Sequence, residues 1–223
     1  MRRAVNSVLI AVSIIAAGTI GFGAYRVMHE RPSAPPPSAA SAGAEEPEVL
    51  AASTTKVPEM RPVFSLQDVE GKSRSITEWD GKTLVINFWA TWCAPCRREI
   101  PMLNALSAAR AAQGVAVIGI AVDLRDKVVP YAKEVGINYP LLIGEEDGLD
   151  AASAFGLGSI GLPTTVFVDA TGRVVTAHLG ELHADQADLI VDTILDVNRG
   201  AISIEQARTR ISDGLKTSGR KSG

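Results

Sequence analysis

Short apolar runs alternate along the chain with segments in which apolar side chains recur at helical spacing. Residues 83–88 (TLVINF), 115–122 (VAVIGIAV) and 164–168 (TTVFV) are nearly continuous apolar runs, which is typical of buried strands. Helical spacing predicts four helices. They are expected over residues 94–113, 126–135, 149–155 and 189–197.

Smaller elements complete this pattern. Short strands are expected near residues 63–66 and 139–143. Asp169-Ala170-Thr171-Gly172 has the composition of a hairpin turn, and it predicts a further strand over residues 174–178. Strands and helices that alternate and end in a hairpin and a helix predict an α/β fold, a central mixed β-sheet flanked by helices.

A longer apolar segment lies near the beginning of the chain. Residues 4–25 carry no charge, and a helix of this length crosses a bilayer. The segment is longer than the apolar core of a signal peptide and lacks a clean cleavage site, so residues 1–29 are expected to be an uncleaved anchor. Arg2 and Arg3 favour a cytoplasmic N-terminus only slightly, because basic residues also follow the segment.

The composition divides the rest of the chain into three parts. Residues 30–58 are rich in proline, alanine and serine and contain no aromatic residue, so we expect a flexible linker. Residues 59–199 hold the predicted strands and helices of one domain. Residues 200–223 are expected to be a short helix and a basic flexible tail. The basic residues of this tail are Arg208, Arg210, Lys216, Arg220 and Lys221.

Composition and charge exclude several classes of protein. The chain is 46% hydrophobic and 21% charged, which is within the globular range, and its net charge is −3. This charge argues against nucleic acid as a partner. Two cysteines, Cys93 and Cys96, are too few for a disulfide scaffold or a four-cysteine metal site. The sequence therefore predicts no metal and no cofactor.

The two cysteines carry the candidate chemistry. They follow the strand at 83–88 directly, and Cys93 is expected just before the next helix or at its first position. A helix N-terminus stabilises a thiolate, so Cys93 is the predicted nucleophile and Cys96 the resolving thiol. Pro95 suits a first helical turn, and a disulfide across so short a loop adds little stability.

Other interpretations of the pair are weaker. The cysteines could be inert core thiols, or zinc ligands with His178 and His183, although these histidines lie far along the chain. A peroxide-reducing site of the peroxiredoxin pattern would need proline and threonine where the chain has Ile86 and Ala90. A haem attachment motif would need histidine where Arg97 follows Cys96.

Two motifs carry a resemblance to a known family. TLVINFWATWCAPCRREIPML and GLPTTVFVDATGRVV resemble the membrane-anchored, thioredoxin-like thiol–disulfide oxidoreductases of the ResA and TlpA type, over residues 60–198. The resemblance implies a thioredoxin fold with an N-terminal strand extension and a central strand–helix insertion at residues 126–155. It also implies that Pro163 is cis and lies against the cysteine pair, where it would position substrates.

The resemblance also implies a biological setting. It indicates a single-pass protein of the cytoplasmic membrane, anchored by its N-terminal helix, with its domain in the periplasm. Its substrates would be cysteine-containing apo-proteins, such as apo-cytochromes c or copper-site proteins, and a membrane reductase would donate electrons. The function that follows is reduction of protein disulfides. The alternatives are a disulfide-forming oxidant and a non-catalytic binding or chaperone domain.

Several further residues receive expected roles. Ordinary thioredoxins carry a buried aspartate where this chain has Asn87, so another group must exchange protons with Cys96. Glu99, three residues after Cys96, is the candidate, and its alternative role is that of a solvated acid near a helix start. Trp89 is expected in the core. The predicted substrate-binding residues are Trp92, Pro95, Leu162 and Thr164.

Overall fold

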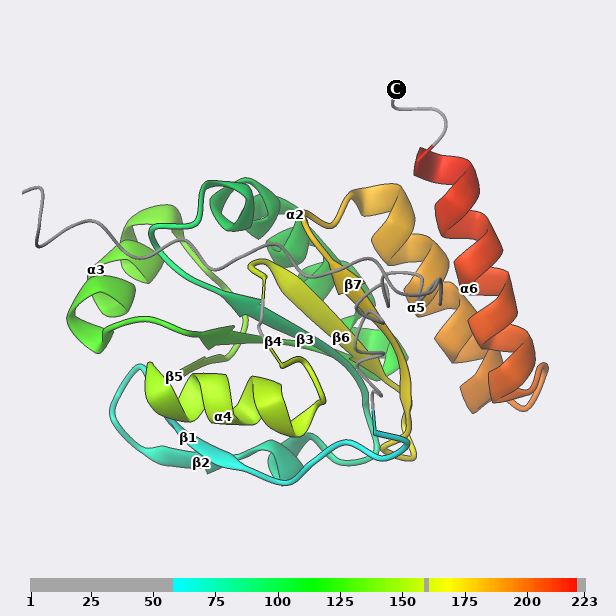
Figure 1. Cartoon of the computed structure of the whole chain (residues 1–223), viewed down its shortest axis with the longest axis horizontal. Coiled ribbons are helices and arrows are strands. Elements are labelled where there is room, and N and C mark those ends of the chain that lie inside the picture. Colours follow the sequence, from blue (N-terminus) through cyan, green and yellow to red (C-terminus); the bar gives the residue numbers. More distant parts are fainter. Residues whose placement is uncertain (1–57, 159–160, 220–223) are drawn as a thin grey trace, which may run out of the picture. The chain divides into compact units, whose positions relative to one another are not determined.

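The computed structural model describes residues 58–158 and 161–219 (Figure 1). The predicted anchor and all of the predicted linker except Pro58 lie outside these residues. Among the described helices, none has both the length and the apolar character that a membrane span needs.

Seven strands form one sheet in the order β2-β1-β5-β4-β3-β6-β7. The pairs β3–β4 and β4–β5 are parallel, and the other neighbours are antiparallel. The strands are β1 (Ser65–Asp68), β2 (Ser73–Ser75), β3 (Thr83–Trp89), β4 (Val115–Ala121), β5 (Leu141–Ile143), β6 (Thr164–Val168) and β7 (Val174–Leu179).

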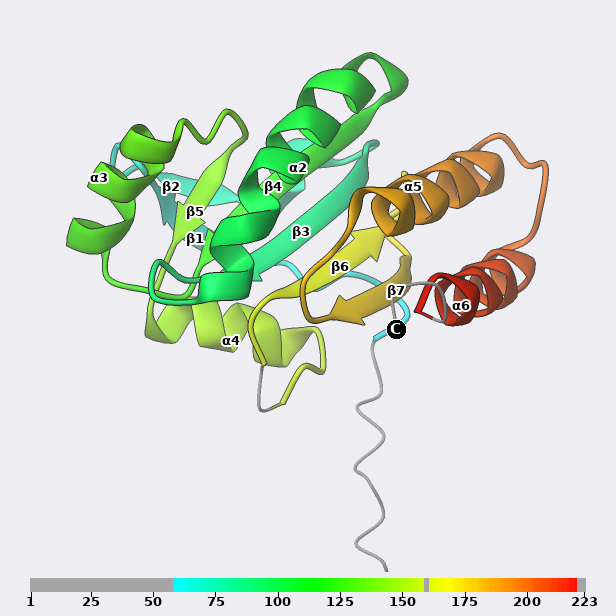
Figure 2. The ribbon, with the colours of Figure 1, turned by 90° about the horizontal axis from the view of Figure 1, so that it is seen from above.

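Helices cover both faces of the sheet (Figure 2). They are α2 (Ala94–Arg110), α3 (Arg125–Val135), α4 (Glu146–Ala154), α5 (Ala184–Asn198) and α6 (Ile204–Gly219), with 3-10 turns at Ile76–Trp79 and Ala111–Gln113. Helices α2, α3 and α5 lie on one face, and α4 lies on the other. The predicted α/β class and mixed sheet are therefore confirmed.

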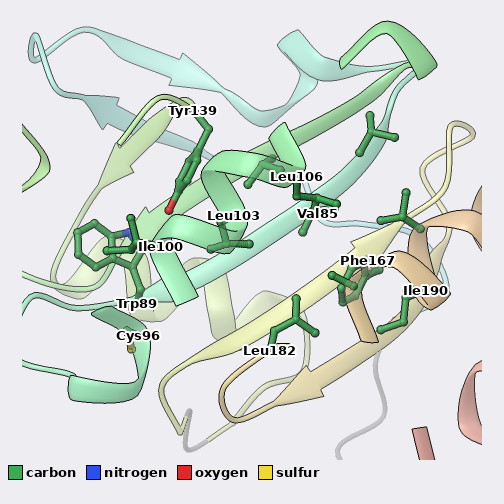
Figure 3. Packing of buried hydrophobic residues seen from close by; sticks show 14 of the residues in the cluster. Val85, Trp89, Cys96, Ile100, Leu103, Leu106, Tyr139, Phe167, Leu182 and Ile190 are labelled. Carbon is green, nitrogen blue, oxygen red and sulfur yellow. The ribbon is translucent and has the colours of Figure 1, made fainter. Parts of the chain in front are cut away.

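Alternate residues of the central strands supply two cores. On β3, Val85 belongs to the cluster beneath α2 and α5, which includes Leu103 and Ile190 (Figure 3). Its neighbour Leu84 belongs to the cluster on the opposite face, beneath α4. Because successive side chains of a strand point to opposite faces, a strand that is buried on both sides is an uninterrupted apolar run.

The expected insertion joins the N-terminal strands to the sheet. Between β4 and β6 the chain forms α3, β5 and α4, so the insertion has a helix on each side of its strand. Strand β5 pairs with β4 and, on its other side, with β1. The hairpin of β1 and β2 therefore extends the sheet through the inserted strand.

A helix after Gly200 was predicted and is confirmed, but it is longer than expected, and the predicted flexible tail was wrong for the residues that it includes, up to 219. Helix α6 has 16 residues, and Ile204, Ala207 and Ile211 are buried on it. This spacing gives α6 an apolar face, which packs on α5. Three of the supposed tail cations, Arg208, Arg210 and Lys216, lie on the helix, and Arg220 and Lys221 lie outside the described residues.

The close packing of the core can be tested where β4 and β5 approach each other. A Cβ atom added at Gly119 would lie 2.6 Å from Leu141 Cδ2 and 3.0 Å from Tyr139 Cε2. Gly119→Ala is expected to lower the free energy of unfolding by about 1–3 kcal/mol, because the close-packed core resists added volume. Urea denaturation measures this loss. Gly158→Ala is the control, because no atom lies within 4 Å of its added Cβ. Equal stability of the two variants would contradict the packing described.

Candidate active site

Cys93 and Cys96 lie where the chain passes from β3 into α2. Cys93 is the N-cap residue of α2, and its Sγ accepts a hydrogen bond from the Cys96 amide at 3.3 Å. The two sulfur atoms form a disulfide with an S–S distance of 2.01 Å. Cys96 is fully buried and Cys93 is 5% exposed. The predicted position of Cys93 at the start of the helix is confirmed. Its side chain is less exposed than expected for a nucleophile at the surface.

Asp123 fixes the segment that leads to Cys93. One of its carboxylate oxygens accepts hydrogen bonds from the amide and hydroxyl of Thr91, at 2.9 and 2.5 Å, and the other accepts from the Leu124 amide. Asp123 follows β4, whose carboxyl end lies beside that of the parallel strand β3. The sequence interpretation missed this residue. The signal that could have found it is an acidic residue just after β4, since β4 is the parallel neighbour of β3, which leads to the cysteines.

Glu99 is buried one helical turn after Cys96. It is 2% exposed, so it is not the solvated acid of the alternative interpretation. One carboxylate oxygen accepts from Asn87 Nδ2 at 2.8 Å, and the other accepts from the Leu182 amide at 2.9 Å. Asn87 also donates to Thr165 Oγ1 at 3.0 Å. Donors from β3 and from the loop after β7 therefore meet one carboxyl group.

Burial controls the protonation of Glu99. Desolvation raises the pKa of this carboxyl group from 4.5 to about 7, although the hydrogen bonds from Leu182 and Asn87 act in the opposite direction. A group whose pKa is near neutrality can both accept and release a proton under physiological conditions. Asn87 does not titrate, so within this hydrogen-bonded group Glu99 is the ionisable member.

Pro163 directly precedes β6, the strand that borders β3. The Leu162–Pro163 peptide bond is cis, as predicted. Thr164 pairs with Phe88, so the strand register places Pro163 beside the end of β3 from which the chain leads to Cys93. The Pro163 carbonyl oxygen accepts a hydrogen bond from the Gly180 amide at 2.9 Å. Loop 180–182, which connects β7 to α5, therefore contacts both Pro163 and Glu99.

The residues predicted to bind substrates differ in exposure. Trp92 is 70% exposed, while Pro95 and Leu162 are half-buried, so these three side chains can contact a partner. Thr164 is buried, and its hydroxyl donates to the Gly161 carbonyl at 2.6 Å. The Thr164 side chain therefore stabilises its own loop, and its role in binding substrate stays a prediction.

Two further apolar side chains differ in exposure. Leu179 is 71% exposed and pairs with Thr164 in the sheet, although the sequence interpretation did not select it. Trp89 is 1% exposed and packs near Tyr131, which confirms its place in the core. Figure 3 shows Trp89 and Cys96 at one end of the cluster beneath α2.

This geometry defines a class of protein. A disulfide between residues three apart at a helix N-terminus, after a central strand whose neighbour follows a cis-proline, is the site of a thioredoxin-like thiol–disulfide oxidoreductase. The model of the AhpC/TSA family matches residues 57–177, and the chain belongs to this family.

Named relatives agree with this class. The chain is 37% identical over 114 residues to the thiol-disulfide oxidoreductase ResA of Geobacillus thermodenitrificans, covering 51% of this chain and 63% of the relative, less than two thirds of its length. It is 31% identical over 132 residues to the ResA of Halalkalibacterium halodurans, covering 59% of this chain and 73% of that relative. A thiol:disulfide interchange protein of the thioredoxin family from Chlorobium tepidum TLS is similar in structure, with a TM-score of 0.56 and 34% identity over 62% of this chain and 97% of that one.

The raised pKa of Glu99 predicts a pH-dependent stability. The folded chain binds this proton more tightly than the unfolded chain, so ionisation of Glu99 destabilises the fold as pH rises from about 4.5 to about 7. The cost above this window is about 3 kcal/mol, because one pKa unit corresponds to about 1.4 kcal/mol. Glu99→Gln is expected to become more stable relative to the wild type by about this amount across the window.

Urea denaturation between pH 4 and pH 8 measures this difference. Burial lowers the pKa of His178 in both proteins, so this residue makes the fold more stable as pH rises, opposite to Glu99. Subtracting the wild-type curve of stability against pH from that of the variant removes this contribution. Glu134→Gln removes an exposed carboxylate from α3 and serves as the control for the lost charge. A stability difference that does not change with pH would contradict the raised pKa.

Proposed function

We propose that the protein reduces disulfides in other proteins. The observation that carries this proposal is the unequal placement of the two sulfurs. Cys93 Sγ lies at the N-terminus of α2 and accepts an amide hydrogen bond, whereas Cys96 is fully buried. The helix terminus stabilises a thiolate on Cys93, so this residue reacts first.

The reaction begins from the reduced dithiol. The Cys93 thiolate attacks one sulfur of the substrate disulfide, forms a mixed disulfide and releases the other substrate sulfur as a thiolate. Cys96 then attacks Cys93 Sγ, which breaks the mixed disulfide and releases the second substrate sulfur. Two electrons pass to the substrate, and the protein ends in the disulfide form that the structure contains.

Glu99 is the proposed proton acceptor for Cys96 in the second step. A thiol must lose its proton before it attacks, and Cys96 is too buried to exchange that proton freely with solvent. Glu99 lies one turn further along α2 and has a pKa of about 7. It therefore takes the proton from Cys96 during substrate reduction and returns it when the disulfide is reduced again.

The surface around the disulfide supports a protein substrate. Trp92 and Leu179 present exposed apolar side chains from two different parts of the fold. Such side chains suit flexible or incompletely folded polypeptides, which expose apolar residues beside their cysteines. We propose cysteine-containing apo-proteins of cytochrome c or copper-site maturation as substrates, with a membrane reductase as the electron donor.

The proposed location is the periplasmic side of the cytoplasmic membrane. The uncharged apolar segment at residues 4–25 supports an anchor, and the resemblance to membrane-anchored oxidoreductases supports an extracytoplasmic domain. The proline-rich residues 30–58 would then give the domain reach toward partners near the membrane.

Trapping of partners tests the reaction. Cys96→Ser is expected to accumulate mixed disulfides through Cys93, because the thiol that resolves them is missing. Cys93→Ser is the matched control and should trap little. Non-reducing electrophoresis followed by mass spectrometry identifies the attached proteins. Equal trapping by the two variants would contradict the assigned roles, and a reduction potential near that of the oxidant DsbA, about −120 mV, would contradict reduction as the direction.

Fractionation of cells tests the location. The full chain is expected in the membrane fraction, with its domain open to protease added from the periplasmic side. A chain that begins at Val57 is expected to be soluble and to reduce disulfides. Recovery of a soluble form cleaved after the apolar segment would contradict the anchor.

A further inference from the structure

An ion pair joins α2 to loop 180–182 beside the disulfide. Arg98, in the second turn of α2, donates from Nε to both carboxylate oxygens of Glu181, at 3.2 and 2.9 Å, and its Nη2 donates a further hydrogen bond. The Arg98 side chain is 60% exposed and that of Glu181 is 23% exposed. Exposed ion pairs contribute little to stability, so the importance of this pair lies in which two segments it joins.

The ion pair lies next to the buried hydrogen bond on Glu99. Arg98 and Glu99 are consecutive on α2, and Glu181 and Leu182 are consecutive in the loop. Arg98 contacts Glu181 at the surface, while Glu99 accepts from the Leu182 amide inside. Two neighbouring contacts therefore set the separation between helix and loop.

The same loop contacts the cis-proline. Gly180 has a φ of +96° and donates its amide to the Pro163 carbonyl oxygen at 2.9 Å. His178 Nε2 lies 3.3 Å from the Glu181 carbonyl oxygen, and the Leu182 side chain is buried in the core beneath α2 and α5. Loop 180–182 thus lies between the proposed proton acceptor and the proline next to the proposed substrate site.

We propose that the Arg98–Glu181 ion pair is a positioning device that keeps the Leu182 amide on Glu99 and thereby sets the pH at which Cys96 exchanges its proton. The proposal rests on the proposed role of Glu99. Glu181 and Arg98 do not contact the sulfur atoms in this scheme; they act through the loop.

The groups around Glu99 define the expected direction of change. Asn87 from β3 donates to Glu99 and Thr165 from β6 accepts from Asn87, and both are uncharged. Tyr139 stays neutral because burial raises its pKa. The nearby charge is that of Glu181, which raises the pKa of Glu99 slightly and is itself paired with Arg98. His178 contacts the Glu181 carbonyl oxygen, and burial lowers its pKa; the charge of His183 lowers the pKa of Glu181.

Two single variants separate positioning from simple electrostatics. If charge alone matters, Arg98→Gln raises the pKa of Glu99 and Glu181→Gln lowers it, because the first exposes a negative neighbour and the second removes it. If the ion pair positions the loop, both variants weaken the Leu182 hydrogen bond to the ionised carboxylate. We expect both variants to raise the pKa of Glu99, by about half to one pH unit, within the normal spread of values in folded proteins.

Carbon-13 NMR of the Glu99 carboxyl group in glutamate-labelled disulfide protein measures this pKa without reference to activity. The exchanged pair, Arg98→Glu with Glu181→Arg, is expected to restore most of the wild-type value. Arg110→Gln is the matched control, because Arg110 joins α2 to Asp188 and Asp192 on α5 without contacting loop 180–182. It should leave the Glu99 titration unchanged. Shifts of opposite sign in Arg98→Gln and Glu181→Gln, or no shift in either, would overturn the proposal.

The pH dependence of insulin-disulfide reduction then separates the positioning role of the ion pair from the proton-acceptor role of Glu99. If Glu99 is the proton acceptor, Arg98→Gln and Glu181→Gln shift the pH–rate profile in the same direction as the pKa measured by NMR. Glu99→Gln then removes the step of the profile that the titration of Glu99 produces. If Glu99→Gln leaves the profile unchanged, the proton-acceptor role fails. The NMR titration still decides in that case whether the ion pair positions the loop.

Discussion

The buried carboxyl group of Glu99 constrains the arrangement of the whole site. An ionised carboxylate away from water is costly unless hydrogen-bond donors meet it. Here the donors come from Asn87 on β3 and from Leu182, which lies 83 residues after Glu99 in the chain. Helix α2, the central strand and the loop after β7 must therefore come together correctly for donors to meet the buried carboxyl group, and the disulfide lies one helical turn away from this junction.

The buried carboxyl group of Glu99 also explains why an amide, Asn87, stands at this position of β3. Its side-chain amide donates to Glu99 and to Thr165 at once, and the pairing of Asn87 with Thr165 across β3 and β6 makes this possible. An aspartate at position 87 would place two carboxyl groups within hydrogen-bond distance, and their repulsion would force one to remain protonated. The change from an acid to an amide on β3 therefore accompanies the placement of the acid on α2.

The C-terminal helix protects a different part of the sheet. Strand β7 is the last strand of the sheet, and such edges expose backbone groups that can pair with other chains. Arg208 on α6 donates to the carbonyl oxygens of Val174 and Val175 and so occupies part of this edge. The apolar residues of α6 were visible in the sequence, but the basic residues between them suggested a tail. In the folded chain, Arg208 has a structural partner.

The sequence by itself determined the elements and the reactive pair. Continuous apolar runs marked β3, β4 and β6 because buried strands need apolar side chains on both faces, and the spacing of the two cysteines before a predicted helix indicated the chemistry. These are local signals. Only the tertiary structure decided that Glu99 is buried, that Asp123 fixes Thr91, and that loop 180–182 contacts both Glu99 and Pro163. Each of these contacts joins segments far apart in sequence, so it depends on strand register and helix packing, which no local pattern of residues specifies.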